Sequence, residues 1–238
     1  MSQNLSGQKI LVIGGSKFLG EAIVRKAAAA GAQVVIGARD LTQAKSVADS
    51  LPGGSAVHLD ITDEATVAAA AAELGKIDHI VITASAHHNV PVAELEKDKI
   101  ITAFDAKVFG PLLVAKHFAR NLSKAGSIVL FSGVAAWKPG APYTIMGVAN
   151  GAVAFLTTHL AKELAPVRVN AISPGIINSG TWDVLGAETK KGLLDGVAAS
   201  VPVGRAGVSD DIVNAVLWLL GAGFVSGETI HVEGGARF

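Results

Sequence analysis

The sequence of 238 residues contains no cysteine, and aromatic residues make up only 5% of it. The absence of cysteine excludes disulfide bonds, thiolate catalysis and cysteine-ligated zinc, and we expect no metal site. The chain also has no excess of charge, because 20 basic residues balance 20 acidic ones. Without a basic cluster, neither nucleic acid nor an anionic membrane is favoured as a partner.

Long apolar segments are missing as well. Residues 1–9 are polar and lack the apolar stretch of a signal peptide. No apolar run approaches the ~18–20 residues needed to cross a bilayer. We therefore expect a soluble, cytoplasmic protein.

What the chain does contain is typical of helices packed closely on a buried parallel sheet. Half of its residues are hydrophobic and 27 are glycine. Short apolar runs rich in β-branched residues indicate strands at residues 10–13, 34–36, 56–59, 80–82, 128–131, 167–172 and 229–232. Helical spacing of apolar residues occurs between them, at residues 19–27, 41–51, 65–74, 100–122, 149–164 and 209–220.

This alternation predicts one α/β domain of Rossmann type over residues 1–238. We expect a doubly wound parallel sheet of about seven strands with helices on both faces. The longest stretch without a helical or strand pattern is residues 173–205, which we interpret as an irregular substrate loop following a strand. Ser209 is expected to be the N-cap of the last helix.

Residues 10–20, with the sequence ILVIGGSKFLG, indicate a strand, a tight turn and the start of a helix. Gly14 permits the reversal, and Gly20 allows the helix to pack closely on the sheet. The unpaired N–H groups at the helix N-terminus suit a pyrophosphate, although a tight turn without a ligand has the same pattern. The turn residues expected to contact a dinucleotide are Gly14, Ser16, Lys17, Phe18, Leu19 and Gly20.

This turn resembles the first motif of the short-chain dehydrogenase/reductase family, usually written T-G-x-x-x-G-x-G. Gly14 and Gly20 match, Ile13 stands at the threonine position, and Phe18 stands at the middle glycine. The large side chain of Phe18 narrows the space over the pyrophosphate.

The resemblance extends over nearly the whole chain. Residues 152–157 and 160–165 resemble the family's long helix, residues 168–175 its sixth strand and Pro-Gly turn, and residues 227–235 its last strand. It implies that Asp60 accepts a hydrogen bond from the adenine amino group. The further cofactor-binding positions that it implies are Ile61, Ala84, Asn150, Pro174, Gly175 and Ile177.

The end of the second predicted strand bears on the choice of cofactor. It reads Gly37-Ala38-Arg39, with no carboxylate to bind a ribose 2′-hydroxyl. Arg39 can bind a 2′-phosphate with two hydrogen bonds, and Lys17 can supply a second charge. This predicts NADPH, or its oxidised form NADP, as the cofactor. The alternative is that both are solvated surface cations.

The resemblance also implies a catalytic Ser, Tyr and Lys, but these positions carry Gly133, Met146 and Asn150. The only tyrosine, Tyr143, is followed four residues later by Gly147, so no Tyr-x-x-x-Lys pair exists in any register. Ser132 is adjacent to the serine position, and on a strand it should face the opposite side.

Three residues are candidates for a replacement proton donor. His87, with its neighbour His88, follows the fourth strand and has a pKa suited to proton donation near neutral pH. Tyr143 lies one helical turn before Met146, and Lys107 stands where the family has a catalytic Asn. The alternatives are an exposed loop histidine for His87, loop packing for Tyr143 and a helix-surface cation for Lys107.

Large apolar side chains suggest a small-molecule substrate that is bulky and mostly apolar. Trp137, Trp182, Met146 and Phe224 are candidates for the substrate pocket, with core or subunit packing as the alternative. The resemblance implies a homo-oligomer, a tetramer or a dimer. Ile212, Val216, Leu219 and Leu220 form an apolar helix face that suits either such an interface or the core.

These observations favour an NADPH-dependent oxidoreductase that reduces a carbonyl, an imine or an activated alkene with a nonstandard proton donor. An imine can arrive already protonated, which removes the need for the tyrosine. Two alternatives remain. One is a catalytically inactive NADP(H)-binding sensor or structural protein, and the other is a lyase or isomerase.

Overall fold

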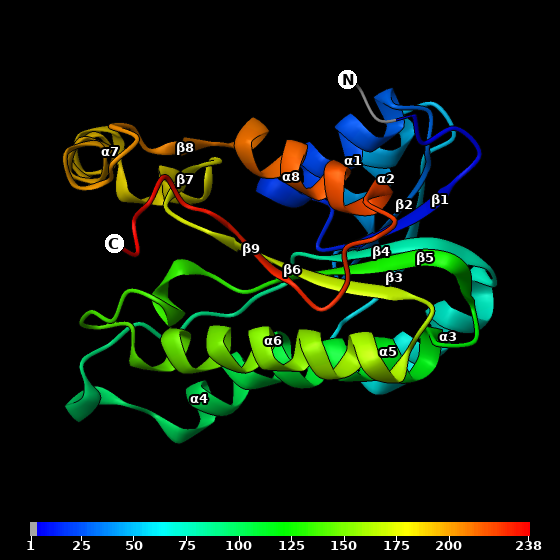
Figure 1. Ribbon diagram of the computed structural model, residues 1–238, viewed down its shortest axis with the longest axis horizontal. Helices are drawn as coiled ribbons and strands as arrows, with labels where there is room; N and C mark the ends of the chain where they lie inside the picture. The colour runs from blue at the N-terminus through cyan, green and yellow to red at the C-terminus, as the bar shows by residue number, and fades with distance from the viewer. Residues whose placement is uncertain (1–3) are drawn as a thin grey trace.

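The computed structural model describes residues 4–238, so Met1–Gln3 of the polar N-terminal segment lie outside it. Its centre is a parallel sheet of seven strands in the order β3-β2-β1-β4-β5-β6-β9 (Figure 1). The predicted doubly wound sheet is therefore confirmed. The strands are β1 (Lys9–Ile13), β2 (Gln33–Ala38), β3 (Ser55–His58), β4 (Ile77–Ile82), β5 (Leu122–Phe131), β6 (Arg168–Pro174) and β9 (Thr229–Val232).

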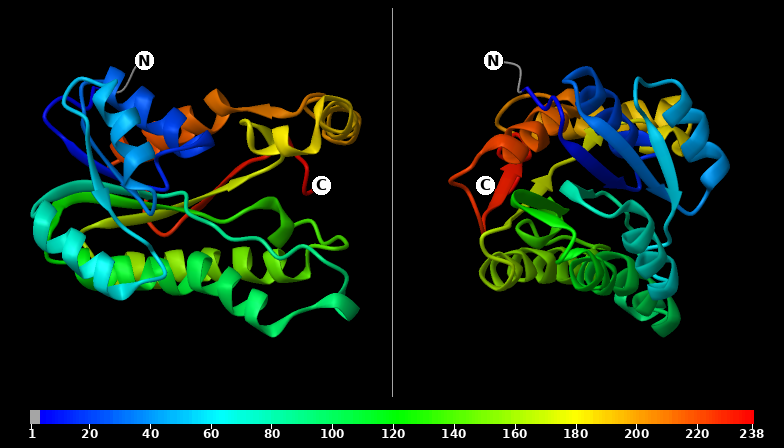
Figure 2. Two further views of the ribbon diagram at one scale, coloured as in Figure 1. Left: turned by 180° about the vertical axis from the view of Figure 1, so that it is seen from behind. Right: turned by 90° about the vertical axis from the view of Figure 1, so that its right-hand side faces the viewer.

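Helices cover both faces of this sheet (Figures 1 and 2). One layer contains α1 (Phe18–Ala29), α2 (Leu41–Asp49) and α8 (Ser209–Gly221). The other contains α3 (Glu64–Leu74), α4 (Lys97–Phe104), α5 (Gly110–Phe118) and α6 (Thr144–Glu163). Two clusters of buried apolar residues, one between each layer and the sheet, form the core.

The last helix, α8, belongs to the core. Its apolar face packs with α1 and the sheet and is at most 2% exposed at Ile212, Val216, Leu219 and Leu220. The interface alternative for this face is therefore wrong. The predicted N-cap is also wrong, because Ser209 is the first residue of the helix. The carboxylate of Asp211 instead accepts a hydrogen bond from the backbone N–H of Val208, which precedes the helix.

The single helix predicted for residues 100–122 is divided in the structure. It begins earlier, as α4, passes through a π-helical turn at Asp105–Phe109 and continues as α5, while Leu122 already belongs to β5. A π-helical turn contains an extra residue and changes the direction in which side chains point. It sets the orientation of Lys107, which lies within this turn.

Residues 173–205 are not an irregular loop as predicted. They contain the short strand β7 (Ile177–Asn178), which pairs with β8 (Gly207–Val208), a 3-10 turn at Thr181–Leu185 and the 14-residue helix α7 (Ala187–Ser200). No residue of α7 is buried, which explains why no apolar stripe marked it. In Figure 1, α7 stands at the edge of the molecule near the C-terminus.

The expectation that no segment is long and apolar enough to cross a bilayer does not hold for the longest helix, α6. By length and composition alone, α6 is apolar enough to cross a bilayer. In the structure, however, 44% of its most apolar window is buried, and Val153 and Leu160 pack in the core beneath the sheet. We therefore interpret α6 as a core helix of the fold.

Candidate functional site

A cleft of about 700 Å³ lies at the carboxyl ends of the central strands. It is bordered by the turn after β1, the segment after β4, the start of α6 and the segment after β6. Every residue predicted to bind the cofactor lines this one cleft. These residues are Gly14, Ser16, Lys17, Phe18, Leu19, Gly20, Arg39, Asp60, Ile61, Ala84, Asn150, Pro174, Gly175 and Ile177.

The turn after β1 is compact and leaves no room for a side chain at Gly14 or Gly20. Gly14 has a φ of +86°, and a Cβ on it would lie 2.7 Å from Oγ1 of Thr83. A Cβ on Gly20 would collide with the carbonyl oxygen of Gly14. The hydroxyl of Thr83 is 3.1 Å from the carbonyl oxygen of Ile13 and 3.2 Å from that of Gly14. Sequence reasoning gave Thr83 no role, although it directly follows β4.

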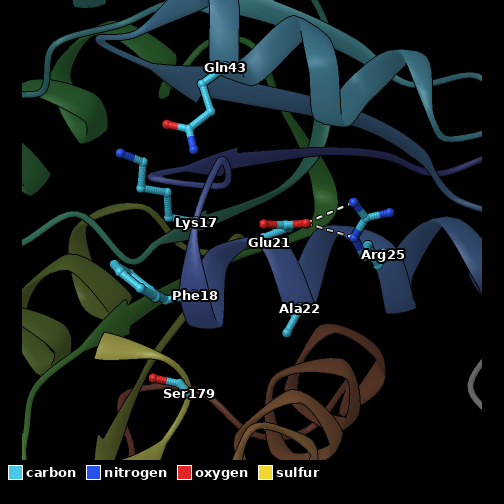
Figure 3. Close-up of a pocket in the computed structure, with 7 residues that line it drawn as sticks. All are labelled: Lys17, Phe18, Glu21, Ala22, Arg25, Gln43 and Ser179. Atoms are coloured by element: carbon cyan, nitrogen blue, oxygen red, sulfur yellow. Dashed lines mark hydrogen bonds and ion pairs between the residues drawn. The ribbon is translucent and has the colours of Figure 1, made fainter. Parts of the chain in front are cut away.

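Two cations border the cleft near the end of β2. Lys17 and Arg39 both line it, and neither takes part in an ion pair among residues 4–238. The neighbouring Asp40 is occupied as the N-cap of α2, where its carboxylate accepts the N–H of Gln43 at 3.0 Å. Figure 3 shows Lys17 and Gln43 extending into the same region. This arrangement leaves two positive charges available to an anionic group.

Lys107 is not a helix-surface cation, because its side chain lies inside the molecule. The residue is only 7% exposed and lines the cleft. Nζ donates hydrogen bonds to the carbonyl oxygen of Phe131 at 2.6 Å and to that of Ser132 at 3.1 Å. Burial lowers the pKa of Lys107 to about 8. The surface alternative for this residue is therefore wrong.

The segment after β5 meets α6 next to this lysine. The hydroxyl of Ser132 donates to the carbonyl oxygen of Asn150 at 2.8 Å, so Ser132 faces α6. We had expected it to face away, but β5 ends at Phe131 and strand alternation no longer applies. A Cβ on Gly133 would lie 2.6 Å from Nδ2 of Asn150. The side chain of Asn150 thus occupies the space that a larger residue 133 would need.

The side-chain oxygen of Asn150 has no hydrogen-bond partner among residues 4–238. The Oδ1 atom of Asn150 is buried and accepts no hydrogen bond in the structure. A buried carbonyl oxygen without a donor is unfavourable. Because Asn150 also lines the cleft, a hydroxyl group of a bound ligand would satisfy this oxygen.

The other candidate proton donors differ in position. His87 is exposed and lines the cleft, and desolvation together with the charge of Lys107 lowers its pKa. His88 is buried elsewhere and accepts a hydrogen bond from the N–H of Glu96 at 3.2 Å. Tyr143 precedes α6, is 42% exposed and lines the cleft. His87, Lys107 and Tyr143 therefore border the same cleft, whereas His88 does not line it.

The predicted apolar pocket is only partly present. Met146 and Trp182 line the cleft, and the indole N–H of Trp182 donates to the carbonyl oxygen of Ile177 at 3.0 Å. Trp137 instead packs edge-on against His231, with ring centroids 4.9 Å apart. Phe224 is fully exposed at the surface. The pocket role predicted for Trp137 and Phe224 is therefore wrong, because neither lines the cleft.

A doubly wound sheet with a glycine-rich turn and a cleft at the strand ends defines a dinucleotide-binding protein of Rossmann type. Comparison with known proteins narrows this class. Residues 15–237 match the family model described as enoyl-(acyl carrier protein) reductase. The chain therefore belongs to the short-chain dehydrogenase/reductase family of oxidoreductases.

Relatives over the full length support this assignment. An uncharacterized oxidoreductase of Methylorubrum extorquens is 32% identical, with 98% of this chain and 99% of that protein covered. Galactitol 2-dehydrogenase of Agrobacterium fabrum is 29% identical, with 97% and 98% covered. The crystal structure of a small-chain dehydrogenase in complex with NADPH has a TM-score of 0.85 and 32% identity, covering 97% and 98%.

Proposed function

We propose that the protein is an NADPH-dependent reductase in which Lys107 donates the proton. The observation that carries this proposal is a buried lysine, Lys107, that lines the cleft. It lies beside the segment where Gly133, Met146 and Asn150 take the places of the family's Ser, Tyr and Lys. The substrate that we propose is a bulky, mostly apolar carbonyl compound, imine or activated alkene.

The residues of the cleft suit NADPH. Gly14 and Gly20 leave the backbone open to a pyrophosphate at the N-terminus of α1. Lys17 and Arg39 supply positive charge for a 2′-phosphate. The unpartnered Oδ1 of Asn150 can accept a ribose hydroxyl, and a structurally similar relative was crystallised with NADPH. When bound, NADPH supplies a hydride to the substrate.

Besides the hydride, the reduction requires a proton, and Lys107 is suited to donate it. An ammonium group has three N–H bonds, and the two carbonyl oxygens of Phe131 and Ser132 occupy two of them. The third can donate to a substrate oxygen or nitrogen. A pKa of about 8 keeps Lys107 protonated at neutral pH, yet makes it a stronger acid than an ordinary lysine.

His87 is suited to a supporting role. Its lowered pKa leaves the imidazole uncharged at neutral pH. An uncharged imidazole can carry a proton from water on one nitrogen while releasing another, and His87 borders both the cleft and solvent. We propose that it returns a proton to Lys107 after each turnover.

The variants Lys107→Met and Lys107→Arg test this function. NADPH oxidation is followed by absorbance with a panel of ketones, aldehydes and imines. Loss of the donor should reduce kcat/KM by about 10²–10⁴-fold in Lys107→Met while NADPH affinity is retained. In the parent protein, activity should fall as the pH rises through about 8, because the neutral amine has no proton to give. Lys107→Arg should also be slow, because a guanidinium is too weak an acid to give up its proton, and it should show no fall near pH 8.

Lys116→Met is the matched control, because Lys116 is an exposed lysine of α5 that pairs with Glu64 at the surface. It should leave the rate and its pH dependence unchanged. Full activity in Lys107→Met would contradict the role of Lys107. A protein that binds NADPH tightly but consumes none across the panel would contradict the reductase function.

The second candidate is a noncatalytic NADP(H)-binding sensor. It is favoured by the simultaneous presence of Gly133, Met146 and Asn150, none of which exchanges protons. A sensor should bind NADPH and NADP⁺ with different affinities, and calorimetry with each nucleotide measures this directly. Equal affinities together with steady NADPH consumption would exclude it.

We further propose that the protein is a homo-oligomer. Large apolar side chains are exposed on the outer side of the layer that contains α5 and α6. They are Phe109, Leu112, Val148 and Phe155. A second copy of the chain would bury them.

A further inference from the structure

Phe18 has a backbone conformation that residues with a side chain rarely adopt. Its φ is +52°, and among residues 4–238 every other positive φ belongs to a glycine. Left-handed backbone of this kind is unfavourable for a large side chain and persists where the surroundings impose it, often at functional sites. The presence of phenylalanine rather than glycine therefore calls for a compensating contact.

The ring of Phe18 lies close to Gly180. A Cβ on Gly180 would lie 3.2 Å from Cδ1 and 3.5 Å from Cε1 of the ring. Gly180 itself has a φ of +96° and precedes the 3-10 turn at Thr181–Leu185. In Figure 3, Phe18 stands at the start of α1 and Ser179 on a separate segment, and both line the groove. The phosphate turn and residues 173–205, here called the substrate segment, thus approach each other at Phe18 and Gly180, with no room for a side chain at Gly180.

This contact separates two hollows in the surface. The main cleft adjoins an outer groove of about 470 Å³ along α1, which Glu21, Ala22 and Arg25 also line (Figure 3). The cleft and the groove share four residues, among them Phe18 and Ser179. Phe18 and the Ser179–Gly180 segment therefore form a partition between the deep cleft and the outer groove.

We propose that Phe18 and Gly180 form a bridge over the pyrophosphate position, so that the dinucleotide enters and leaves only when this contact opens. The proposal rests on the cofactor site of the proposed function. Phe18 is the first residue of α1, and anions bind at helix N-termini. A pyrophosphate held there lies next to the partition. Phe18 is thus a positioning residue that controls how fast the cofactor exchanges.

The substrate segment is built to open locally at this point. Its base is fixed, because β7 pairs with β8 and the indole of Trp182 bonds to the carbonyl oxygen of Ile177. Gly180 lies between these anchors. The 3-10 turn at Thr181–Leu185, which follows it, has no buried residue. In the proposed opening, Gly180 moves away from the ring while these anchors stay in place.

Stopped-flow fluorescence of NADPH with the full-length protein tests the bridge. Phe18→Gly removes the ring and the unfavourable φ together. Both the association and the dissociation rate should rise about tenfold, whereas the dissociation constant should change much less. Phe18→Leu keeps an apolar side chain opposite Gly180 and should restore most of the slow exchange. Phe224→Gly is the matched control, because Phe224 is exposed outside the cleft, and it should leave both rates unchanged.

Three outcomes would overturn the bridge. A rise in the dissociation rate alone, with a proportional loss of affinity, would make Phe18 an ordinary contact of the cofactor. Tighter binding with slower release of NADPH in Phe18→Gly would show that the Phe18 ring hinders cofactor binding. Unchanged rates, with thermal unfolding confirming that the variant is folded, would show that the contact does not control exchange. Failure of the parent protein to bind NADPH would instead overturn the cofactor site itself.

Discussion

His79 is a buried histidine whose two ring nitrogens both contact side chains. Nδ1 lies 2.8 Å from the hydroxyl of Ser127, and Nε2 lies 3.0 Å from Oε1 of Gln8. Desolvation, followed by the nearby charge of Arg168, lowers the pKa of His79 to about 4. The native protein therefore holds this histidine uncharged at neutral pH, whereas the unfolded chain protonates it near pH 6.5.

This difference predicts acid sensitivity. The folded pKa lies below the unfolded value, so the contribution of His79 is complete above about pH 6.5 and is lost as the pH falls toward 4. The full loss corresponds to about 3 kcal/mol of unfolding free energy. Urea unfolding at pH 7 and pH 4 measures most of this loss, and His79→Gln should show a smaller difference between the two. An equal difference in parent and variant would contradict the role of His79.

At the scale of elements, the end of α8 is stabilised by an arginine from a strand. The guanidinium of Arg168, the first residue of β6, donates to the carbonyl oxygens of Leu219, Leu220 and Ala222 at 2.8, 2.7 and 3.0 Å. The last carbonyl groups of a helix have no partners within it and carry partial negative charge. Arg168 therefore joins the sheet to the layer of α1 and α8.

Replacing this arginine should destabilise the fold. Arg168→Met leaves buried carbonyl oxygens without donors and should lower the unfolding free energy by about 2–4 kcal/mol. Urea denaturation measures the change. Arg120→Met serves as the control, because Arg120 is exposed and its loss should change little. Equal denaturation midpoints for the two variants would show that the bonds from Arg168 to the end of α8 do not contribute to stability.

The sequence predicts the sheet better than the segments around the cleft. All seven strands were predicted, because buried parallel strands are short runs of β-branched residues. The helix α7 was missed because it buries no residue and so has no apolar stripe. The burial of Lys107 was not predicted either, since a π-helical turn shifts side-chain directions without leaving a mark in apolar spacing. The cleft residues of the first turn were predicted because glycines and strand ends specify them locally.

At the scale of the whole molecule, the two helix layers differ in the apolar side chains that they expose to solvent. The outer side of the layer with α6 exposes Phe155 at 73% and Val148 at 58%, and these two residues lie seven apart on the same helix face. By contrast, the apolar face of α8 in the other layer is buried in the core. The layer with α6 is therefore the better candidate for contact between subunits.

A charge on this face should separate the subunits. Phe155→Glu should reduce the molar mass measured by light scattering from that of a dimer or tetramer to that of one chain, because a buried carboxylate would lack a partner. Val184→Glu is the control, since Val184 is 87% exposed in the substrate segment, and it should leave the mass unchanged. A parent protein that is already a single chain in solution would contradict the proposal.

The fit between Gly133 and Asn150 has a consequence for how this protein can evolve or be engineered. A serine introduced at position 133 would meet the amide of Asn150, whose nitrogen lies 2.6 Å from the site of the new Cβ. The side chain of Asn150 therefore has to move aside, or position 150 has to change as well, when position 133 gains a side chain. Substitutions at these two positions are thus expected to depend on each other, and the double variant should be made alongside the single ones.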